Sequence, residues 1–143
     1  NLDEADKDGM LLIHYAVKYG RVEIYRYLMQ EISFSEIPIT NQKYNLWHLA
    51  MHQNSTEILD AMLEDDDEAQ EHLIGERDES NHNPFDLACL KGQTACIQWM
   101  CNLPWGFYFI GIEHSISLIC QNNSNLSQRE VIRLIDLITN NYS

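Results

Sequence analysis

Apolar residues near the start of the chain fall in two short stretches with helical spacing. The residues concerned are Leu12, Ile13, Ala16 and Val17 in the first stretch and Ile24, Tyr27 and Leu28 in the second. Positions spaced in this way share one face of an α-helix, so each stretch predicts a helix with one buried side. Gly20 lies between the stretches, and glycine accepts the positive φ of a helix end without a steric penalty. The pattern therefore predicts two short helices joined by a tight turn.

The same pattern returns twice further along the chain. The segment 13–16 is echoed at 47–50 and again at 85–88, with a step of 34 residues from His14 to His48 and of 38 residues from His48 to Asp86. Other columns agree as well, namely Ala16, Ala50 and Ala88, and Gly20, Asn54 and Gly92. A period of about 33 residues is typical of stacked helix pairs, each too short to be stable alone. The repeat therefore predicts an array of stacked units and favours a binding partner over a reaction.

The residues of the units carry a resemblance to a known family. The first unit contains Asp6, Gly9, Ile13, His14, Ala16 and Gly20 in order, and the third contains Asn83, Pro84, Leu87 and Ala88. This succession resembles the ankyrin repeat over about residues 3–101. The second unit departs most, with Lys43 where the family has glycine, and Asp86 replaces the family histidine in the third. The resemblance implies that the repeat histidine bonds the backbone of a neighbouring turn, and that the turns and inner helices line a concave surface that binds other proteins.

Beyond Cys101 the echo fades, but helical spacing continues. Apolar residues recur at Ile112, Ile116, Ile119 and Cys120, and later at Val131, Leu134, Ile135 and Ile138. Ser127 and Glu130 form a capping box that opens the last stretch. We predict that this segment is a degenerate unit that caps the array, with a polar outer side at Arg129, Arg133, Asp136 and Asn140.

These patterns predict one all-α domain over residues 1–143, an ankyrin-type solenoid. Its predicted units are repeat 1 at about 6–36, repeat 2 at about 40–74, repeat 3 at about 78–103 and the degenerate cap at about 108–140. Nothing in the sequence provides a helix to cover the first unit. We therefore expect the chain to be a piece of a longer protein, in which such a cover is supplied.

Charge and composition narrow the class of partner and the compartment. The net charge is −13 over 143 residues, which excludes nucleic acid as a partner because phosphates require the opposite sign. No apolar stretch is long enough to span a bilayer, and no secretion signal is recognisable, so we expect no membrane partner. The four cysteines lack the spacing of a disulfide framework or a zinc site. We expect a monomer in a reducing, intracellular and cytoplasmic setting.

The acidic residues concentrate in the run 64–68. One interpretation is a solvated insertion, which also accounts for the longer second step of the repeat. The alternative is a docking patch for a partner with a basic surface. Carboxylates at a helix C-terminus oppose its dipole, so we expect the second helix of repeat 2 to end near Leu63.

Four groups of residues are candidates for chemistry or binding. His48 and His52 share a helix face, but the residues between them lack the carboxylate of a His-Glu-x-x-His zinc site. Cys96 and Cys101 have no adjacent base, and burial raises the pKa of a thiol. The exposed carboxylates of the acidic run lack the desolvation that general acid–base work needs. We expect no catalytic residues, no metal and no cofactor.

The fourth group is aromatic and follows repeat 3. It consists of Trp99, Trp105, Phe107, Tyr108 and Phe109. The first interpretation is that these rings fill the junction between repeat 3 and the cap. The alternative is a contact hot spot, and alternation along this stretch makes Tyr108 its best contact candidate.

By position in the repeat, a further set of residues is not required for stacking and is predicted to meet the partner. This set is Met10, Lys18, Tyr19, Tyr44, His52, Gln53, His82, Leu90 and Lys91. Tyr19, Tyr44 and His52 rank first because they are large and lie in adjacent units. The predicted function is a protein-protein interaction module that binds a protein or peptide on its concave face.

A rival hypothesis gives the module a different task. It would be a targeting or regulatory appendage of an enzyme whose catalytic domain lies outside these residues. The irregular units, rich in Asn, Gln and Ile, also resemble ankyrin modules of effector proteins from intracellular bacteria. That resemblance implies the host cell cytoplasm as the location.

Overall fold

The computed structural model describes residues 4–66, 73–104, 110–122 and 125–142. Within these ranges the regular structure is helical and contains no strand, which confirms the predicted all-α class. The α-helices are α1 (Leu12–Lys18), α2 (Val22–Leu28), α3 (Leu46–Ala50), α4 (Glu57–Asp65), α5 (Pro84–Lys91), α6 (Thr94–Cys101), α7 (Ile112–Asn122) and α8 (Gln128–Tyr142). Two 3₁₀ turns, η1 (Phe34–Glu36) and η2 (Leu73–Gly75), lie in the connections.

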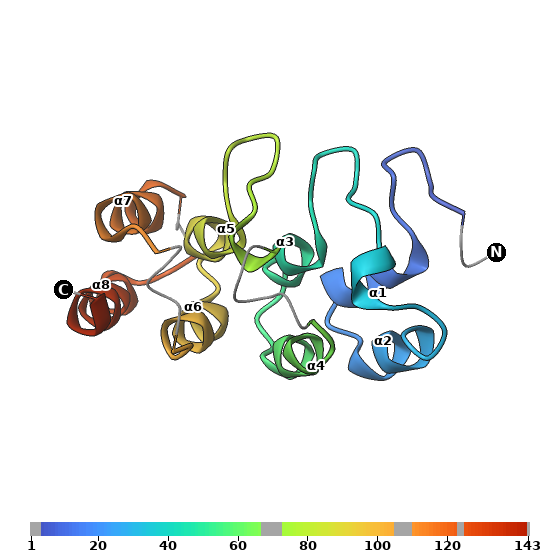
Figure 1. Ribbon diagram of the computed structural model, residues 1–143. Helices are drawn as coiled ribbons and strands as arrows, with labels where there is room; N and C mark the ends of the chain where they lie inside the picture. Colours follow the sequence, from blue (N-terminus) through green and yellow to red (C-terminus); the bar gives the residue numbers. More distant parts are fainter. Residues whose placement is uncertain (1–3, 67–72, 105–109, 123–124, 143) are drawn as a thin grey trace.

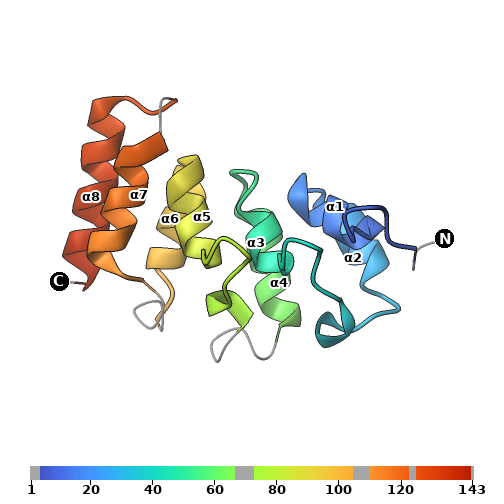
Figure 2. The ribbon, with the colours of Figure 1, turned by 90° about the horizontal axis from the view of Figure 1, so that it is seen from above.

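The helices are arranged in two rows (Figure 1). An inner row holds α1, α3, α5 and α7, and an outer row holds α2, α4, α6 and α8. Seen from above, the successive pairs follow one another along one direction, with the two termini at opposite ends (Figure 2). Three loops, 4–11, 37–45 and 76–83, rise on the side of the inner row. The surface formed by these loops and the inner row is called the loop face below.

The three loops share one hydrogen-bond pattern. In the first loop Asp6 N donates to Met10 O at 3.0 Å and Gly9 N to Asp6 O at 3.0 Å. The same pairs recur 34 residues later, from Thr40 N to Tyr44 O and from Lys43 N to Thr40 O. They recur once more at Asp78 N to His82 O and Asn81 N to Asp78 O. The sequence period is therefore also a period of backbone geometry.

Each loop contains one residue with a positive φ in the same column. Gly9 has φ +77°, Lys43 +63° and Asn81 +66°. Glycine carries no penalty there and asparagine a small one, whereas a lysine side chain is disfavoured in the left-handed region. Lys43 is thus a strained substitute for the glycine that the first unit has in this column.

Replacing Lys43 with glycine should stabilise the protein. We expect Lys43→Gly to raise the free energy of unfolding by about 0.5–1 kcal/mol, because relief of the left-handed strain outweighs the added freedom of the unfolded chain. Urea unfolding of the two proteins measures the difference. Lys91→Gly is the control, since Lys91 lies in α5 and glycine costs stability inside a helix.

The repeat histidines join each unit to the next loop. His14 accepts from Leu11 N through Nδ1 at 2.7 Å and donates through Nε2 to Pro38 O at 2.8 Å. His48 repeats this with Asn45 N at 3.1 Å and His82 O at 3.0 Å. Both rings are fully buried. The contact with a neighbouring turn that the resemblance implied is therefore present twice.

Asp86 takes the histidine column of the third unit but makes different contacts. Its carboxylate accepts from Asn83 N at 3.1 Å, as the histidines accept from their own helix starts. It also faces Arg77 at 3.4 Å and His114 of α7 at 3.8 Å. In the first two units the histidine faces the loop of the next unit. The third unit, which has aspartate instead, is followed by the longer helices α7 and α8.

Most helix ends agree with the sequence. Asn83 caps α5 by accepting from Asp86 N, Pro84 is its first residue, and Gly92 ends it with φ +68°. Gly20 has φ +67°, and Ser127 with Glu130 forms the predicted capping box of α8. Asn54 shares the column of Gly20 and Gly92, but its φ is not positive. Its side chain instead accepts from Ala95 N at 3.0 Å and so links the second unit to α6.

The predicted buried faces of the first pair are partly wrong. Ile13, Ala16 and Val17 are buried as expected, but Leu12 is 50% exposed. In α2 the predicted residues Ile24 and Tyr27 are 52% and 68% exposed, and Tyr25 is buried instead. Tyr25 packs towards α4, where its hydroxyl donates to Asp65 at 2.8 Å. The periodicity identified an apolar side of α2 that no described helix covers.

The last pair follows its predicted pattern more loosely. In α7 the buried stripe is Ser115, Leu118 and Ile119, while Cys120 is exposed, so the predicted stripe is displaced around the helix. In α8 Leu134 and Ile138 are buried, and the predicted outer residues Arg129, Arg133, Asp136 and Asn140 are all exposed. Across the part of the chain that is described, no helix combines the length and apolar character needed to cross a bilayer.

The start of the acidic run has a structural role. Helix α4 extends two residues beyond Leu63, to Asp65, and Asp66 is only 5% exposed. The Trp47 indole N–H donates to Asp66 Oδ2 at 2.7 Å, and Asp65 accepts from Tyr25 as described above. These bonds offset the unfavourable position of carboxylates at a helix C-terminus. The prediction of a helix end near Leu63 took only the helix dipole into account. Asp67 and Glu68 lie outside the described residues.

Trp99 does not fill the junction that was predicted for it. Its ring packs on Trp47 with centroids 5.9 Å apart, and its indole N–H donates to Asp60 of α4 at 2.8 Å. It therefore joins the second and third pairs rather than the third pair and the cap. The remaining residues of the aromatic group, Trp105, Phe107, Tyr108 and Phe109, lie outside the described residues.

Candidate functional site

A hollow lies on the loop face between the first two helix pairs. It encloses about 240 Å³ and has a largely polar lining. The lining residues are Asp8, Met10, Tyr15, Lys18, Gln42, Tyr44, Leu49 and His52. They come from the first two loops, from α1 and α3 and from the turn after α3, so the repeat brings together residues up to 44 positions apart in the sequence. Lys18, Tyr44, His52 and Met10 belong to the predicted partner-binding set.

Tyr44 and His52 form the aromatic wall of the hollow. Tyr44 is half-buried and meets His52 edge-on with ring centroids 5.6 Å apart. It also lies 5.6 Å from the buried ring of His48. The backbone of Tyr44 is held by the second loop, where its N–H donates to Thr40 Oγ1 at 3.2 Å. This wall is thus fixed by packing on one side and by the loop on the other.

His52 is neutral at physiological pH. Burial lowers its pKa to about 4, and the positive charges of Lys91 and Lys18 act in the same direction. Its Nδ1 donates to the His48 carbonyl at 3.2 Å, which leaves Nε2 as the acceptor nitrogen of the neutral ring. The hollow therefore combines an imidazole acceptor with an ammonium group, a carboxylate and phenol groups.

The buried histidines should make stability depend on pH. Burial lowers the pKa of His14, His48 and His52 below the ordinary 6.5. Below about pH 6.5 the unfolded chain binds protons that the folded chain does not, so the free energy of unfolding falls as pH decreases. We expect the urea midpoint to be highest at pH 7 and above and to fall steadily from pH 6.5 to 5.

Measurements at pH 7.5 and 5.0 test this expectation and stay above the range where Asp6 and Glu36 titrate, since their lowered pKa values lie under 3.8 and 4.5. His52→Gln should reduce the difference between the two pH values. Ile132→Gln should leave it unchanged, because Ile132 is 59% exposed on α8 and carries no titratable group. Equal midpoints at both pH values would contradict the expectation.

Tyr19, which ranked first in the sequence analysis, does not line this hollow. It is 60% exposed and stacks on Tyr15, with centroids 6.5 Å apart and planes 8° from parallel. The Lys18 ammonium lies 5.6 Å from its ring centroid. Tyr19 belongs to an apolar surface at the end of the array, together with Ile24 and Tyr27. The predicted trio is therefore divided between two surfaces.

Met10 and Gln53 do more for the fold than was predicted. Met10 is 7% exposed and belongs to the core, so its placement among free surface positions was wrong. The Gln53 side chain donates to Ala50 O and Ser55 O and accepts from Ser55 N, at 2.6–2.9 Å. Its amide thus closes the turn between α3 and α4. Gln53 is required by the fold, contrary to the prediction.

The other predicted residues are spread along the loop face. His82 is half-buried in the third loop, and its N–H donates to Asp78 Oδ1 at 3.0 Å. Leu90 packs partly against the core, whereas Lys91 is exposed at the end of α5. The effect of Lys91 on the pKa of His52 places the lysine within electrostatic range of the hollow. Tyr108 lies outside the described residues.

The histidines and cysteines that were candidates for chemistry form hydrogen bonds within the fold or are buried. Both ring nitrogens of His48 bond the backbone, so His48 and His52 do not present two free nitrogens to a metal ion. Among the described residues no group of three His, Cys, Asp or Glu side chains gathers around one point. Burial raises the pKa of Cys96 and of Cys101 to about 12, as predicted. Cys96 also donates to Gln53 O at 3.2 Å.

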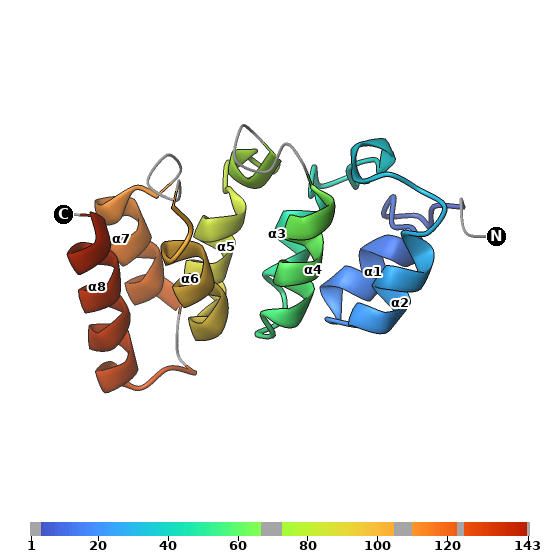
Figure 3. The same cartoon turned by 60° about the horizontal axis from the view of Figure 1, so that its bottom comes forward.

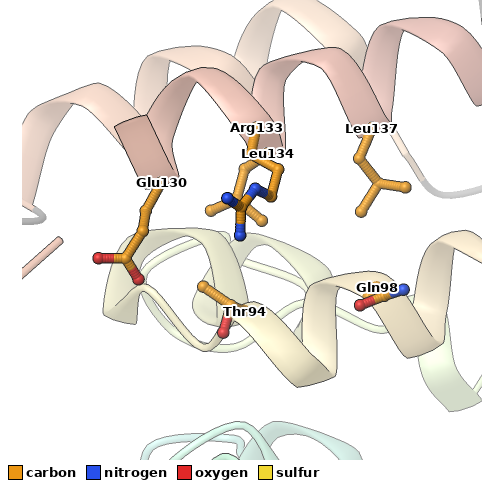
Figure 4. Close-up of a pocket in the computed structure, with 6 residues that line it drawn as sticks. All are labelled: Thr94, Gln98, Glu130, Arg133, Leu134 and Leu137. Atoms are coloured by element: carbon orange, nitrogen blue, oxygen red, sulfur yellow. The ribbon is translucent and has the colours of Figure 1, made fainter. Parts of the chain in front are cut away.

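A second hollow lies between α6 and α8 (Figure 4). Thr94 and Gln98 of α6 face Glu130 and Arg133 of α8 across it. None of the predicted partner-binding residues lines it, and its apolar base is formed by Leu134 and Leu137. It follows the seam between two packed outer helices, away from the loop face.

Sequence reasoning missed part of the first hollow. Tyr15 and Asp8 line it, and the Tyr15 hydroxyl donates to Asp6, which raises the pKa of Tyr15 to about 12. Tyr15 follows the repeat histidine, in a column that holds leucine in the other units. A tyrosine in a column that is otherwise leucine was the one sign in the sequence that Tyr15 has a role outside the core.

Comparison with known proteins adds no family assignment. Neither the scan against protein-family models nor the search of curated proteins found a match to this chain.

Proposed function

We propose that this chain is an array of the ankyrin type whose loop face binds a partner protein or peptide. Five observations support the fold part of the proposal. The loops repeat one hydrogen-bond pattern, and a positive φ recurs in one column. The histidines of two units bond the following loop, and the helix pairs lie in two rows. Adjacent loops are also linked, as Asn41 N donates to Asp8 O at 3.1 Å and Glu79 N to Gln42 O at 3.0 Å.

The hollow between the first two helix pairs is the main observation that supports partner binding at the loop face. It lies on the loop face and gathers Lys18, Tyr44 and His52 from two adjacent units. Tyrosine side chains at a partly enclosed site contribute strongly to binding energy, and a charged group beside them, here Lys18, adds specificity. The hollow receives a side chain of the partner, and the neighbouring loops and inner helices supply the surrounding contact area.

The lining indicates what kind of side chain fits. Lys18 offers a positive charge, Asp8 a negative one, and the rings of Tyr15 and Tyr44 offer flat apolar surfaces. A polar side chain with an aliphatic or planar stem satisfies all three. Beyond the hollow, exposed acidic residues such as Glu76 and Glu79 on the third loop favour a partner with a basic surface.

The test begins with capture of partners on the immobilised chain, followed by binding measurements on the purified partner. We expect Lys18→Glu and Tyr44→Ala each to weaken binding by about tenfold or more. Arg129→Glu reverses a charge at an exposed position of α8 and should leave the affinity unchanged. Circular dichroism melts of all three variants show whether each is folded. Unchanged affinity in a folded Lys18→Glu, Tyr44→Ala double variant would refute the assignment of the loop face.

A further inference from the structure

The first helix pair exposes an apolar surface at the end of the array. Leu12 is 50% exposed, Ile24 52% and Tyr27 68%, and these three lie with Tyr15, Tyr19 and Leu28 around one shallow apolar hollow. We call this surface the N-terminal face. Figure 3 shows α1 and α2 at one end of the row of helices, with no described helix beyond them. Exposed large apolar side chains gathered in one place mark a surface that another molecule or segment covers.

The repeat shows what covers this face in the other units. Leu12 shares its column with Leu46, and Ile24 shares its column with Ile58 and Cys96. Leu46 is 2% exposed, and both Ile58 and Cys96 are 0% exposed. Helix α1 packs on α3 and α2 on α4, and Cys96 donates to Gln53 O of the preceding unit. The N-terminal face is therefore equivalent to an interface that occurs twice within the array.

The third unit also indicates that a helix covering the N-terminal face carries a hydrogen-bond acceptor. Tyr27 shares its column with Trp99, whose indole N–H donates to Asp60 on the preceding helix α4. An acceptor on the covering helix thus meets the polar tip of the aromatic residue in this column. Tyr27 carries a hydroxyl at its tip and can donate in the same way.

The charges around the N-terminal face point in the same direction. The segment 12–28 contains Lys18, Arg21 and Arg26 but one acidic residue, Glu23, in a chain whose net charge is −13. The segment 12–28 itself therefore carries more basic than acidic residues, while the first loop beside it adds Glu4, Asp6 and Asp8 against Lys7. Basic residues around an apolar surface favour a cover that carries carboxylates.

We propose that the N-terminal face docks one further unit of the array, a helix pair stacked on α1 and α2 that presents a carboxylate to Tyr27. The helical nature of this cover follows from the equivalent columns, and its acidity from Trp99 with Asp60 and from the basic surroundings. A second copy of the chain bound through the same face would oppose its basic residues to themselves, because a two-fold interface pairs a surface with its own copy. The proposal is independent of partner binding at the loop face.

The chain itself supplies a probe for this face. A copy of residues 37–75 placed directly before residue 4 preserves the register, since residue 76 shares the column of residue 4. This copy contributes its own α3, α4 and Asp60. We expect the fusion to unfold in one transition, with a Tm at least about 5 °C above that of the original chain, because each added unit contributes interface energy to the array.

Ile24→Asp gives the decisive comparison. In the original chain Ile24 faces solvent, so the substitution should shift the Tm by less than about 2 °C. In the fusion it should abolish the gain, because it places a charge in a closed apolar contact. Ile132→Asp is the matched control, since Ile132 is 59% exposed on α8 and its effect should be small in both proteins.

Three results would overturn the proposal. One is a fusion that melts at the temperature of the original chain, and another is an Ile24→Asp effect of equal size in both proteins. The third is a dimer of the original chain, seen by sedimentation equilibrium, that Ile24→Asp dissociates, because a second copy would then be the occupant. In the fusion, Tyr27→Phe should lower the Tm. When the added copy also carries Asp60→Asn, Tyr27→Phe should lower the Tm by less.

Discussion

Replacing His48 with alanine should lower the free energy of unfolding by about 3 kcal/mol. The ring is fully buried and bridges Asn45 N to His82 O. Its removal takes away the acceptor of the Asn45 N–H and one of two donors to the His82 carbonyl, which keeps the bond from Asp78 N, and it opens a cavity between α3 and the third loop. A lost buried hydrogen bond costs about 1–3 kcal/mol, and the lost packing adds to it. Urea or thermal unfolding followed by circular dichroism measures the loss.

The variant His48→Asp separates the two bonds of the histidine. Asp86 shows that a carboxylate in this column can accept from the start of its own helix, as it does from Asn83 N. An aspartate cannot donate to the His82 carbonyl, so His48→Asp should keep the first bond and lose the second. We expect a loss as large as that of His48→Ala, because a buried charge is added. Arg129→Ala, at an exposed position of α8, serves as the control and should change stability by less than about 0.5 kcal/mol.

The features that the sequence predicted well are those set by local geometry. Gly20 and Gly92 end helices with a positive φ, Asn83 and Pro84 start α5, and Ser127 with Glu130 opens α8. Each depends on a few neighbouring residues and on the backbone conformation that those residues prefer. The spacing of the repeat also placed the helix pairs correctly along the chain.

The features that the sequence pattern did not predict depend on which other helices or turns pack against an element. An apolar stripe identifies a side of a helix that needs a cover, but it does not show whether one is present. Ile24 and Tyr27 were predicted to be buried for this reason, and they are exposed because no described helix packs on that side. Gln53 was treated as a free surface residue because its bonds to Ala50 and Ser55 follow from the path of a turn rather than from a column.

The candidate site was predicted in part. The columns placed Lys18, Tyr44 and His52 on one surface of adjacent units, and all three line the same hollow. Tyr19 shares that unit but points to the N-terminal face, because one further residue along a helix end turns the side chain by about 100°. Asp8 and Tyr15 were missed because their contributions depend on the path of the first loop.

The acidic run offers the second large effect, through Asp66. We expect Asp66→Ala to lower the free energy of unfolding by about 2–3 kcal/mol, because the buried Trp47 indole N–H loses a charged acceptor at 2.7 Å. The solvated-insertion and docking-patch interpretations both require exposed carboxylates, and a residue that is 5% exposed satisfies neither. For this residue the role is structural, and the effect should appear in stability without any partner.

A double-mutant cycle tests that cause directly. In a Trp47→Phe background no indole N–H remains, so Asp66→Ala should cost less than it does in the original chain, with a coupling of about 1–3 kcal/mol. Glu64→Ala is the matched control, since Glu64 belongs to the same run but is exposed, and its effect should stay within about 0.5 kcal/mol. Equal costs for Asp66→Ala and Glu64→Ala would show that general repulsion within the run outweighs the bond. A zero coupling with Trp47→Phe would show that Asp66 acts through other contacts of its carboxylate.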